Sequence, residues 1–593
     1  MTEYAYKRRH KRRTFPVARV IGIVLVLLIV AAGVSAGLLA RGALALRSQA
    51  RELTSDASTL GDQLKTNDVE AARATASRMA QTASDMHAET SMPWWFLGSL
   101  VPVVGQDVAS VRTLSAAADT LAGQALVPLV DALATHPLAG VIDPETNAID
   151  VAAVTELCGV LAQSAPEVHE AAAAVAALPP AQIEQVAGPL ASAQGLVAQF
   201  DGLVEGAAAI ADRLPYLLGA DGPRTYLIIA QNNAEIRATG GFAGAWGTLT
   251  ITNGQLSLGD FRSLKAADWP TEDKRPAITE EERALFGDAI ATASDNANMT
   301  PDFPRAAELM RYYWSYAGGG AVQGVIALDP VLLQQVLAHV GGVTASDGTV
   351  VDGSNAARTL MSDTYARLDV EAQDDFFAEV AELAFDQLVD NLGELGVTGV
   401  AGLMNECASS GRMLMWFEDA QAQAAVETMG MDGGLVQDST QPPVLGVYAN
   451  DDTWAKMCWY MELETQVSEP MVNEDGSRAY TVTTTITNHM TPEEAAALPA
   501  YVTGSSPAAR NPGDLVTHVL LVAPAGGSIT SVSCNSTKVQ GERNATLSGL
   551  GAWTALVNTN LGETTTVTYT VVTAPGTTGD LVLRQTPTAQ AFA

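Results

Sequence analysis

The sequence predicts an α+β multidomain protein with a single transmembrane helix, a helical stalk, an α/β core with a mixed sheet and a C-terminal antiparallel β-sandwich. Three observations support this prediction. Residues 20–40 are apolar and contain no charged residue. Residues 41–215 are rich in alanine, with leucines spaced by three and four as in packed helices. Within residues 456–593, bulky residues alternate with threonines, which is typical of strands with one buried face.

The apolar run at residues 20–40 predicts a membrane-spanning helix. Its 21 residues span roughly 30 Å at the α-helical rise, which is the thickness of the hydrocarbon core of a bilayer. Six lysines and arginines lie between positions 7 and 13, so we expect residues 1–19 to form a basic cytoplasmic tail and the rest of the chain to lie outside the plasma membrane. A cleaved signal peptide is the alternative, because Ala43-Leu44-Ala45 has the spacing of a cleavage site. The length of the run favours a retained signal anchor.

Residues 41–215 predict a helical stalk or bundle. One stripe repeats at alternating spacings of four and three, as in the seam of a coiled coil, and consists of Leu46, Ala50, Leu53, Ala57, Leu60 and Leu64. Prolines divide the alanine-rich stretch that follows into several helices. Trp94 and Trp95 lie between two of these helices, and their rings suit either the headgroup zone of a membrane or the core of a helix junction.

Residues 216–455 predict an α/β core domain. Short apolar runs at 226–230, 245–252 and 324–328 have the composition of strands. Asp329 directly follows the third run and is suited to cap the helix expected after it. The alternation of strands with helical patterns indicates helices that cover a mixed sheet.

Residues 456–593 predict a β-sandwich domain. In the stretches 480–487 and 566–571, bulky residues alternate with threonines, so that one face is buried and the other is in contact with water. Glycines and prolines separate several such stretches, as in antiparallel sandwiches.

The charge of the chain excludes some partners. The formal net charge is −33, although ten of the 33 lysines and arginines lie in residues 1–51. The strongly acidic remainder repels nucleic acid, so no nucleic-acid partner is expected. An extracytoplasmic location also separates the protein from ATP and NAD, and no cofactor is predicted.

The four cysteines are Cys158, Cys407, Cys458 and Cys534, and they form no CxxC motif. An oxidising location permits disulfides, and Cys407–Cys458 is the candidate pair, with buried free thiols as the alternative. No metal site is predicted, because the scattered histidines contain no HExxH motif and the acidic stretches contain no EF-hand loop.

The densest polar signal is the segment 231–244, which directly follows the first predicted strand of the core. Ligands gather at the carboxyl ends of strands in open α/β sheets. The candidate ligand-binding residues of this segment are therefore Asn232, Glu235, Arg237, Gly240 and Gly241. A strand rather than a helix follows, so the segment is not a dinucleotide fingerprint. The alternative is a packed turn in which Glu235 and Arg237 form an internal salt bridge.

A second group of candidates comes from two separate loops and comprises Asp260, Arg262, Asp302 and Arg305. Acids and arginines that converge from different loops can hold phosphate or a metal, because arginine binds phosphate with two hydrogen bonds. Ion pairs at the surface explain the same residues equally well.

The stretch from Tyr226 to Phe242, YLIIAQNNAEIRATGGF, resembles the hallmark of domain-of-unknown-function family 4012, a group of bacterial membrane-anchored exported proteins. The segment 324–330 and the stretch His339-Val-Gly-Gly-Val are similar to that family as well. The resemblance covers residues 200–580 approximately, and it implies a surface location and an architecture but no reaction.

A fainter similarity of residues 324–343 concerns the LytR–CpsA–Psr transferases. These enzymes join polymers from lipid pyrophosphate carriers to peptidoglycan. Their phosphate site, rich in arginine and aspartate, has no clean counterpart in this chain. Arg237, Arg262 and Arg305 match it by residue type alone.

We therefore expect a membrane-anchored extracytoplasmic protein of the cell envelope that binds a wall glycan or a protein partner and is not an enzyme. The sequence contains no GxSxG elbow and no Walker lysine. The alternative is a phosphotransferase-like enzyme of envelope polymer attachment, resembling the LytR–CpsA–Psr proteins. The two hypotheses differ in whether the candidate acids and arginines meet in one pocket.

Overall fold

The computed structural model describes residues 17–590 except positions 67, 103, 138–140, 144, 145, 147, 392–394, 396–398, 400, 401, 404, 405, 408, 505–510, 537, 538 and 578. Side chains are described from position 38 onward, with 39, 40, 65, 185 and 199 as further exceptions. The chain is α+β and divides into two compact units. The first takes in residues up to 62 together with 70–131 and 164–201, and the second takes in 63–69, 132–163 and everything from 202 onward.

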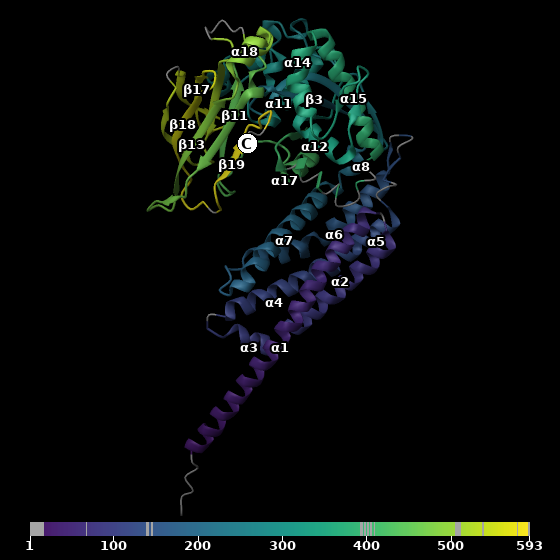
Figure 1. Cartoon of the computed structure of the whole chain (residues 1–593), viewed down its shortest axis with the longest axis vertical. Coiled ribbons are helices and arrows are strands. Elements are labelled where there is room, and N and C mark those ends of the chain that lie inside the picture. The colour runs from purple at the N-terminus through teal and green to yellow at the C-terminus, as the bar shows by residue number, and fades with distance from the viewer. Residues whose placement is uncertain are drawn as a thin grey trace, which may run out of the picture. The chain divides into compact units, whose positions relative to one another are not determined.

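The first unit is a bundle of helices (Figure 1). Its helices, some of which continue into the second unit, are α1 (Val17–Lys65), α2 (Val69–Thr90), α3 (Pro93–Ser99), α4 (Gly105–Thr120), the π-helical η1 (Leu121–Leu126), α5 (Val127–Thr135), α6 (Val151–Ala176) and α7 (Glu184–Ala211). Figure 1 shows that α1 extends beyond its neighbours in the bundle toward its own N-terminus.

The inward face of α1 differs in part from the expected leucine stripe. Its buried and half-buried positions include Gly42, Leu46, Gln49, Leu53, Asp56 and Leu60. The leucines are therefore inside, whereas Ala50 and Ala57 are exposed. Gln49 and Asp56 take two of the seam positions, and Asp56 forms an ion pair with Arg78 of α2 at 3.2 Å.

Among the described residues, we find no helix with the length and apolarity of a membrane span. The predicted span at 20–40 lies within α1, but its side chains, except that of residue 38, lie outside the described part of the chain. Of the two expected tryptophans, Trp95 is buried beside Gly42, and Trp94 is half-buried. Both indole N–H groups donate to Oε1 of Glu89 at 3.2 Å, so these rings form part of a helix junction.

A seven-stranded mixed sheet lies in the second unit, with strand order β1-β2-β5-β4-β3-β6-β9. Strands β3 and β6 are parallel, and the other neighbours are antiparallel. The strands are β1 (Ile142–Asp143), β2 (Ala148–Ile149), β3 (Arg224–Arg237), β4 (Gly240–Thr252), β5 (Gln255–Leu258), β6 (Gly324–Leu328) and β9 (Met413–Phe417). The expected mixed sheet is thus confirmed.

Helices cover both faces of this sheet, as expected from the alternating pattern. Leu227 and Ile229 of β3 point into a core that includes α11, whereas Tyr226 and Ile228 point into the opposite core, which includes α17. The helices of this unit include α8 (Leu214–Leu217), α9 (Glu280–Phe286), α10 (Ala289–Thr292), α11 (Phe303–Tyr316), α12 (Pro330–Val340), α13 (Ala356–Arg358), α14 (Thr364–Arg367), α15 (Val370–Asn391), α17 (Ala420–Thr428), α18 (Pro492–Ala497) and α19 (Ala500–Thr503).

Asp329 caps α12 as the sequence predicts. Its Oδ1 accepts a hydrogen bond from the backbone N–H of Leu332 at 2.8 Å, and Gly341 ends the helix with φ 94°. The second oxygen of Asp329 forms an ion pair with Arg412 at 2.6 Å. A small two-stranded sheet follows α12, formed by β7 (Val343–Thr344) and β8 (Val350–Val351).

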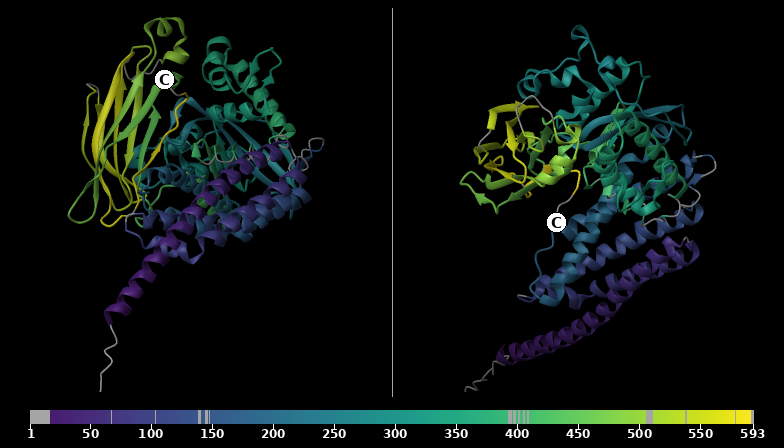
Figure 2. Two further views of the ribbon diagram at one scale, coloured as in Figure 1. Left: turned by 60° about the horizontal axis from the view of Figure 1, so that its bottom comes forward. Right: turned by 45° about the horizontal axis from the view of Figure 1, so that its top comes forward.

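Two five-stranded sheets occupy the C-terminal part of the second unit (Figure 2). One has the order β16-β17-β14-β10-β19, and the other has β11-β13-β18-β15 with β12 paired to β13. Their strands are β10 (Val444–Asp451), β11 (Met461–Val467), β12 (Met471–Val472), β13 (Arg478–Asn488), β14 (Leu515–Val522), β15 (Ser528–Cys534), β16 (Val539–Leu547), β17 (Leu550–Thr559), β18 (Thr564–Val572) and β19 (Val582–Gln585).

The two sheets share one hydrophobic core, to which Val447, Leu521 and Trp553 contribute from one sheet and Val482 and Tyr569 from the other. The expectation of purely antiparallel sheets is wrong at one edge, because β19 runs parallel to β10. Parallel neighbours need a crossover connection rather than a hairpin, and the last strand of the chain arrives from the other sheet. Strand β10 lies before residue 456, the expected start of the last domain, yet it pairs in this region.

Candidate functional site

The polar segment predicted as a site forms a hairpin between β3 and β4, and we call residues 231–241 the bulged hairpin. Asn232 pairs with Phe242 and Ile236 pairs with Gly241, so three residues of β3 are left out of the ladder between them. Such a bulge redirects side chains that a regular strand would place in the sheet. Glu235 is one of the three.

Gly240 and Gly241 are required by the shape of this hairpin. Gly240 has φ 141°, a backbone conformation that residues other than glycine rarely adopt. A Cβ atom on Gly241 would clash with the backbone of Asn232 and Asn233. The two glycines therefore allow two backbone segments to approach closely.

Gln231 holds the hairpin together. Its Oε1 accepts hydrogen bonds from the Thr239 hydroxyl at 3.0 Å, the Gly241 N–H at 3.1 Å and the Asn298 amide at 3.0 Å. The same Asn298 amide donates to the Gly241 carbonyl at 2.7 Å. All four residues are buried, so these bonds satisfy groups that water does not reach. Gln231 and Asn298 are not among the predicted site residues, and the distance of Asn298 along the chain gave no signal of this contact.

Arg237 is buried and 7% exposed. Its guanidinium donates to the backbone carbonyls of Ile236 at 3.1 Å and Asp451 at 3.3 Å, and to Oδ1 of Asn296 at 3.3 Å. Burial raises the pKa of the Asp451 carboxyl, and the charge of Arg237 opposes that rise. Both Nη atoms of the guanidinium thus have partners inside the protein, whereas its buried Nε has none among the described residues.

Glu235 has a different partner from the one considered in the sequence analysis. It forms an ion pair with Lys456, not with Arg237. The side chain of Lys456 is 7% exposed and that of Glu235 is 13% exposed. Lys456 was missed, although a signal existed: it is the one charge in the stretch 454–460, which otherwise contains apolar and aromatic residues.

Aromatic rings surround this ion pair. The Nζ atom of Lys456 lies 5.5 Å from the ring centre of Phe242, 5.2 Å from that of Tyr365 and 5.1 Å from that of Tyr501. Asn232, the remaining candidate of the segment, contacts the hydroxyl of Tyr365. Burial lowers the pKa of the Lys456 ammonium, while the adjoining carboxylate of Glu235 favours its charged form. The bulged hairpin therefore brings Asn232 and Glu235 to one buried, ring-lined site.

The second group of candidates does not join this site. Asp260 is exposed, and Arg262 lies over the ring of Trp314 at 5.0 Å and donates to the Ala317 carbonyl at 3.2 Å. Arg305 forms a 2.7 Å ion pair with the buried Glu282. Both arginines thus have protein groups as partners, Arg305 in its half-buried pair with Glu282 and Arg262 at the surface.

Asp302 is the N-cap residue of α11 and precedes Arg305 by three positions. Burial raises the pKa of its carboxyl to about 6, and the nearby Asp432 adds to the rise. Among the residues that the structure describes, no three histidines, cysteines or acids are placed to hold a metal ion.

The expected disulfide is not formed. Cys407 and Cys458 are free thiols, as are Cys158 and Cys534. Cys407 packs with Leu332 and Met431, whereas Cys458 belongs to the core between the two C-terminal sheets. Each thiol of the expected pair is thus buried in its own apolar cluster, which is the alternative that the sequence left open.

The bulged hairpin also connects the seven-stranded sheet with the C-terminal sheets. The N–H of Ala238 donates to Oδ1 of Asn450 at 2.9 Å, and its carbonyl accepts from the Thr586 hydroxyl at 3.0 Å. Asn233 donates to the carbonyl of Pro587 at 3.3 Å. Most polar groups of the segment therefore take part in an internal joint.

The hairpin lies within the part of the chain that matches a known family model. Residues 221–365 match a family model described as a protein of unknown function (DUF4012). The match confirms the resemblance seen in the stretch from Tyr226 to Phe242. The DUF4012 segment contains β3, β4, β6 and α12, and it ends at Tyr365, so Lys456 lies beyond it. No curated protein and no solved structure matches the chain significantly.

Proposed function

We propose that the protein is a non-catalytic, membrane-anchored component of the cell envelope, whose extracytoplasmic units bind a wall glycan or a protein partner. The apolar run at residues 20–40, behind a basic tail, supports the anchor and its orientation. In this proposal the two C-terminal sheets that share a core are a β-sandwich, and the helical unit stands next to the membrane.

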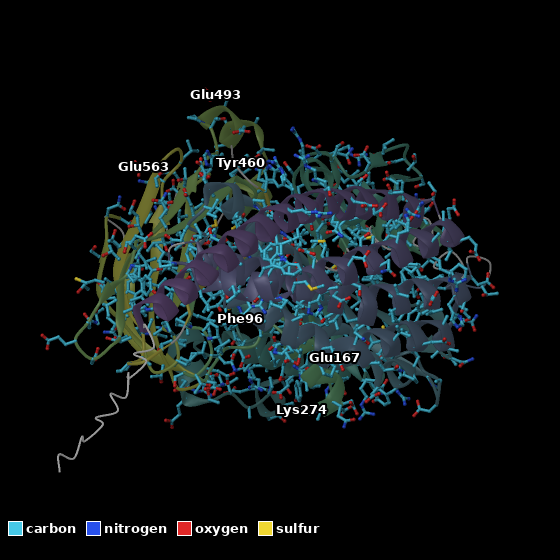
Figure 3. The ribbon with its side chains drawn as sticks, turned by 90° about the horizontal axis from the view of Figure 1, so that it is seen from below. Phe96, Glu167, Lys274, Tyr460, Glu493 and Glu563 are labelled. Carbon is cyan, nitrogen blue, oxygen red and sulfur yellow. The ribbon has the colours of Figure 1, made fainter. Side chains whose placement is uncertain are left out.

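The observation that carries the proposed anchor is an apolar surface at the helix junction, which we call the α3 apron. Its residues are Met92, Phe96, Leu97, Leu100, Val101 and Val104, all of them exposed. Phe96 is 54% exposed and Leu100 is 65% exposed, and Phe96 is labelled in Figure 3. Contiguous exposed apolar residues in a soluble region indicate an interaction surface.

The location of the α3 apron favours a bilayer as its neighbour. The neighbouring Trp95 packs beside Gly42, two residues after the apolar run ends. The apron therefore adjoins the point where a membrane-spanning α1 would leave the bilayer. Phenylalanine and leucine side chains at that level would enter the headgroup region, where amphipathic segments gain by burying apolar area.

The phosphotransferase alternative receives less support. Arg237, Arg262 and Arg305 each contact a different group of the protein, at 3.3, 3.2 and 2.7 Å. A lipid-pyrophosphate site needs such guanidinium groups to point at one ligand. A binding role fits the described residues better than this chemistry.

Protease treatment of intact cells tests the proposed location. We expect external protease to degrade the chain beyond residue 41 and to leave an N-terminal tag intact until the membrane is opened. Sedimentation of the purified full chain with isolated cell wall tests the binding role. A protected C-terminus would contradict the location, and transfer of a lipid-linked polymer by the purified protein would contradict the non-catalytic role.

A further inference from the structure

We infer that Glu235 and Lys456 are joined by an isopeptide bond, which the folded chain forms by itself between the two side chains. Nζ of Lys456 contacts Oε1 of Glu235 directly. Glu235 is held out of the β3 ladder by the bulge, and Lys456 immediately precedes the short helix η8 (Met457–Tyr460). The inference concerns the chemistry of this site and does not depend on where the protein is located.

The surroundings of the pair disfavour two permanent charges. Both side chains are almost completely buried, so water does not solvate the ammonium or the carboxylate. Taking an ammonium and a carboxylate out of water costs several kcal/mol per ion, which their attraction only partly offsets. An amide in the same place carries no net charge, so its formation removes that cost.

The reaction balances without an oxidant or a co-reactant. A proton passes from the ammonium to the carboxylate, which leaves a neutral amine and a neutral carboxylic acid. The amine lone pair attacks the carboxyl carbon, a C–N bond forms, and one C–O bond breaks. The leaving oxygen departs with two protons as water, so a carboxylate and an ammonium become one amide and one water molecule.

The site supplies what this reaction needs. Burial lowers the pKa of Lys456, so its nucleophilic amine form is populated more readily than that of an exposed lysine. Two groups held in contact by a rigid fold react with effective molarities of about 10⁵ M or more. The Tyr365 hydroxyl accepts a hydrogen bond from the Asn232 amide, which leaves the phenolic hydrogen available as a donor beside the pair.

Such a bond would be a covalent cross-link at the internal joint. It would tie the bulged hairpin of the seven-stranded sheet to the turn that follows β10 in the C-terminal sheets. All four cysteines are free, so no disulfide performs this role. A link between distant positions restricts the unfolded chain and resists mechanical opening of the joint.

Mass spectrometry of the full chain tests the inference directly. We expect the folded protein to be lighter than its sequence mass by one water molecule. Trypsin should not cut after Lys456, and it should release the peptide 225–237 joined to the peptide 413–478. The full sequence mass together with normal cleavage after Lys456 would overturn the inference, and this readout needs no variant.

Variants identify the two reacting groups. Glu235→Ala and Lys456→Arg should each restore the full sequence mass, because one lacks the carboxyl and the other lacks a nucleophilic amine. Glu235→Gln should form the same joined peptides with loss of ammonia instead of water. Glu462→Ala is the matched control, because the Glu462 carboxylate pairs with His489 at 2.8 Å and its removal should leave the mass deficit unchanged.

Discussion

Arg237 of β3 donates a hydrogen bond to the backbone carbonyl of Asp451, the last residue of β10, at 3.3 Å. The two residues belong to different sheets, so this bond lies across the joint between the DUF4012 segment and the C-terminal sheets. This guanidinium is 7% exposed and donates to backbone carbonyls of both β3 and β10, so it stabilises the fold. One of the three arginines that matched a phosphate site by residue type is therefore a structural link between the two sheets.

Replacing Arg237 with methionine should destabilise the protein. The variant keeps the apolar volume but leaves the Asp451 carbonyl and Asn296 without their donor, which costs about 3 kcal/mol in a buried site. Denaturant unfolding of the second unit, followed by tryptophan fluorescence, measures this loss. Arg262→Met is the control, because that arginine is exposed and its loss should change stability by less than about 1 kcal/mol. Equal effects of the two substitutions would refute the structural role of Arg237.

Gly241→Ala should be among the most damaging small substitutions in the chain. Its Cβ would clash with the backbone of Asn232 and Asn233, which cannot give way as a flexible side chain can. We expect a loss of about 3 kcal/mol or more in the free energy of unfolding. Gly320→Ala serves as the control, because nothing lies within 4 Å of its added Cβ. A Gly241 variant as stable as this control would show that the hairpin is less tightly packed than described.

Asp302 makes stability depend on pH. Burial raises the pKa of its carboxyl to about 6 in the folded protein, above the value of about 3.9 in an unfolded chain. The folded state therefore holds the proton more tightly, and the stability this provides is complete below pH 4 and is lost as the pH rises through 6. Asp302→Asn lacks the ionisable carboxyl and so escapes this loss, and the variant should gain up to about 3 kcal/mol relative to wild type as the pH rises from 4 to 7. Unfolding midpoints of both proteins across that range measure the difference, and parallel curves would contradict the assignment.

The α3 apron should contact lipid in the full-length protein. A tryptophan introduced as Leu100→Trp should be quenched by lipids that carry bromine on their acyl chains, after subtraction of the wild-type signal. Leu196→Trp is the matched control, because Leu196 is 67% exposed but lies on α7, outside the apron. Equal quenching at both positions, or none at Leu100→Trp while the anchor is inserted, would show that the apron binds something other than the bilayer.

All four cysteines should titrate as thiols. Burial raises the pKa of Cys158 and of Cys407 to about 11, so both should react slowly with thiol reagents at neutral pH in the folded protein. After denaturation without reductant, four thiols per chain should react. Two missing thiols would indicate that the Cys407–Cys458 disulfide forms after all.

Local patterns in the sequence were sufficient for most of the secondary structure. The runs at 226–230 and 324–328 lie in β3 and β6, and Asp329 caps α12 as a short-range signal predicts. The alternation over 480–487 and 566–571 gives β13 and β18, which pair with each other. These features follow from side-chain periodicity and capping, which depend on neighbours a few residues apart.

The tertiary structure decided the partners of the polar residues. Glu235 contacts Lys456 and Arg237 contacts Asp451, and no spacing in the chain indicates either contact. A polar side chain in a bulge can bind a ligand or form an ion pair within the protein. The local sequence is the same in the two cases. Which one it is depends on the segment that the fold brings against it and on whether water is excluded there, because burial determines the cost of a charge without a partner.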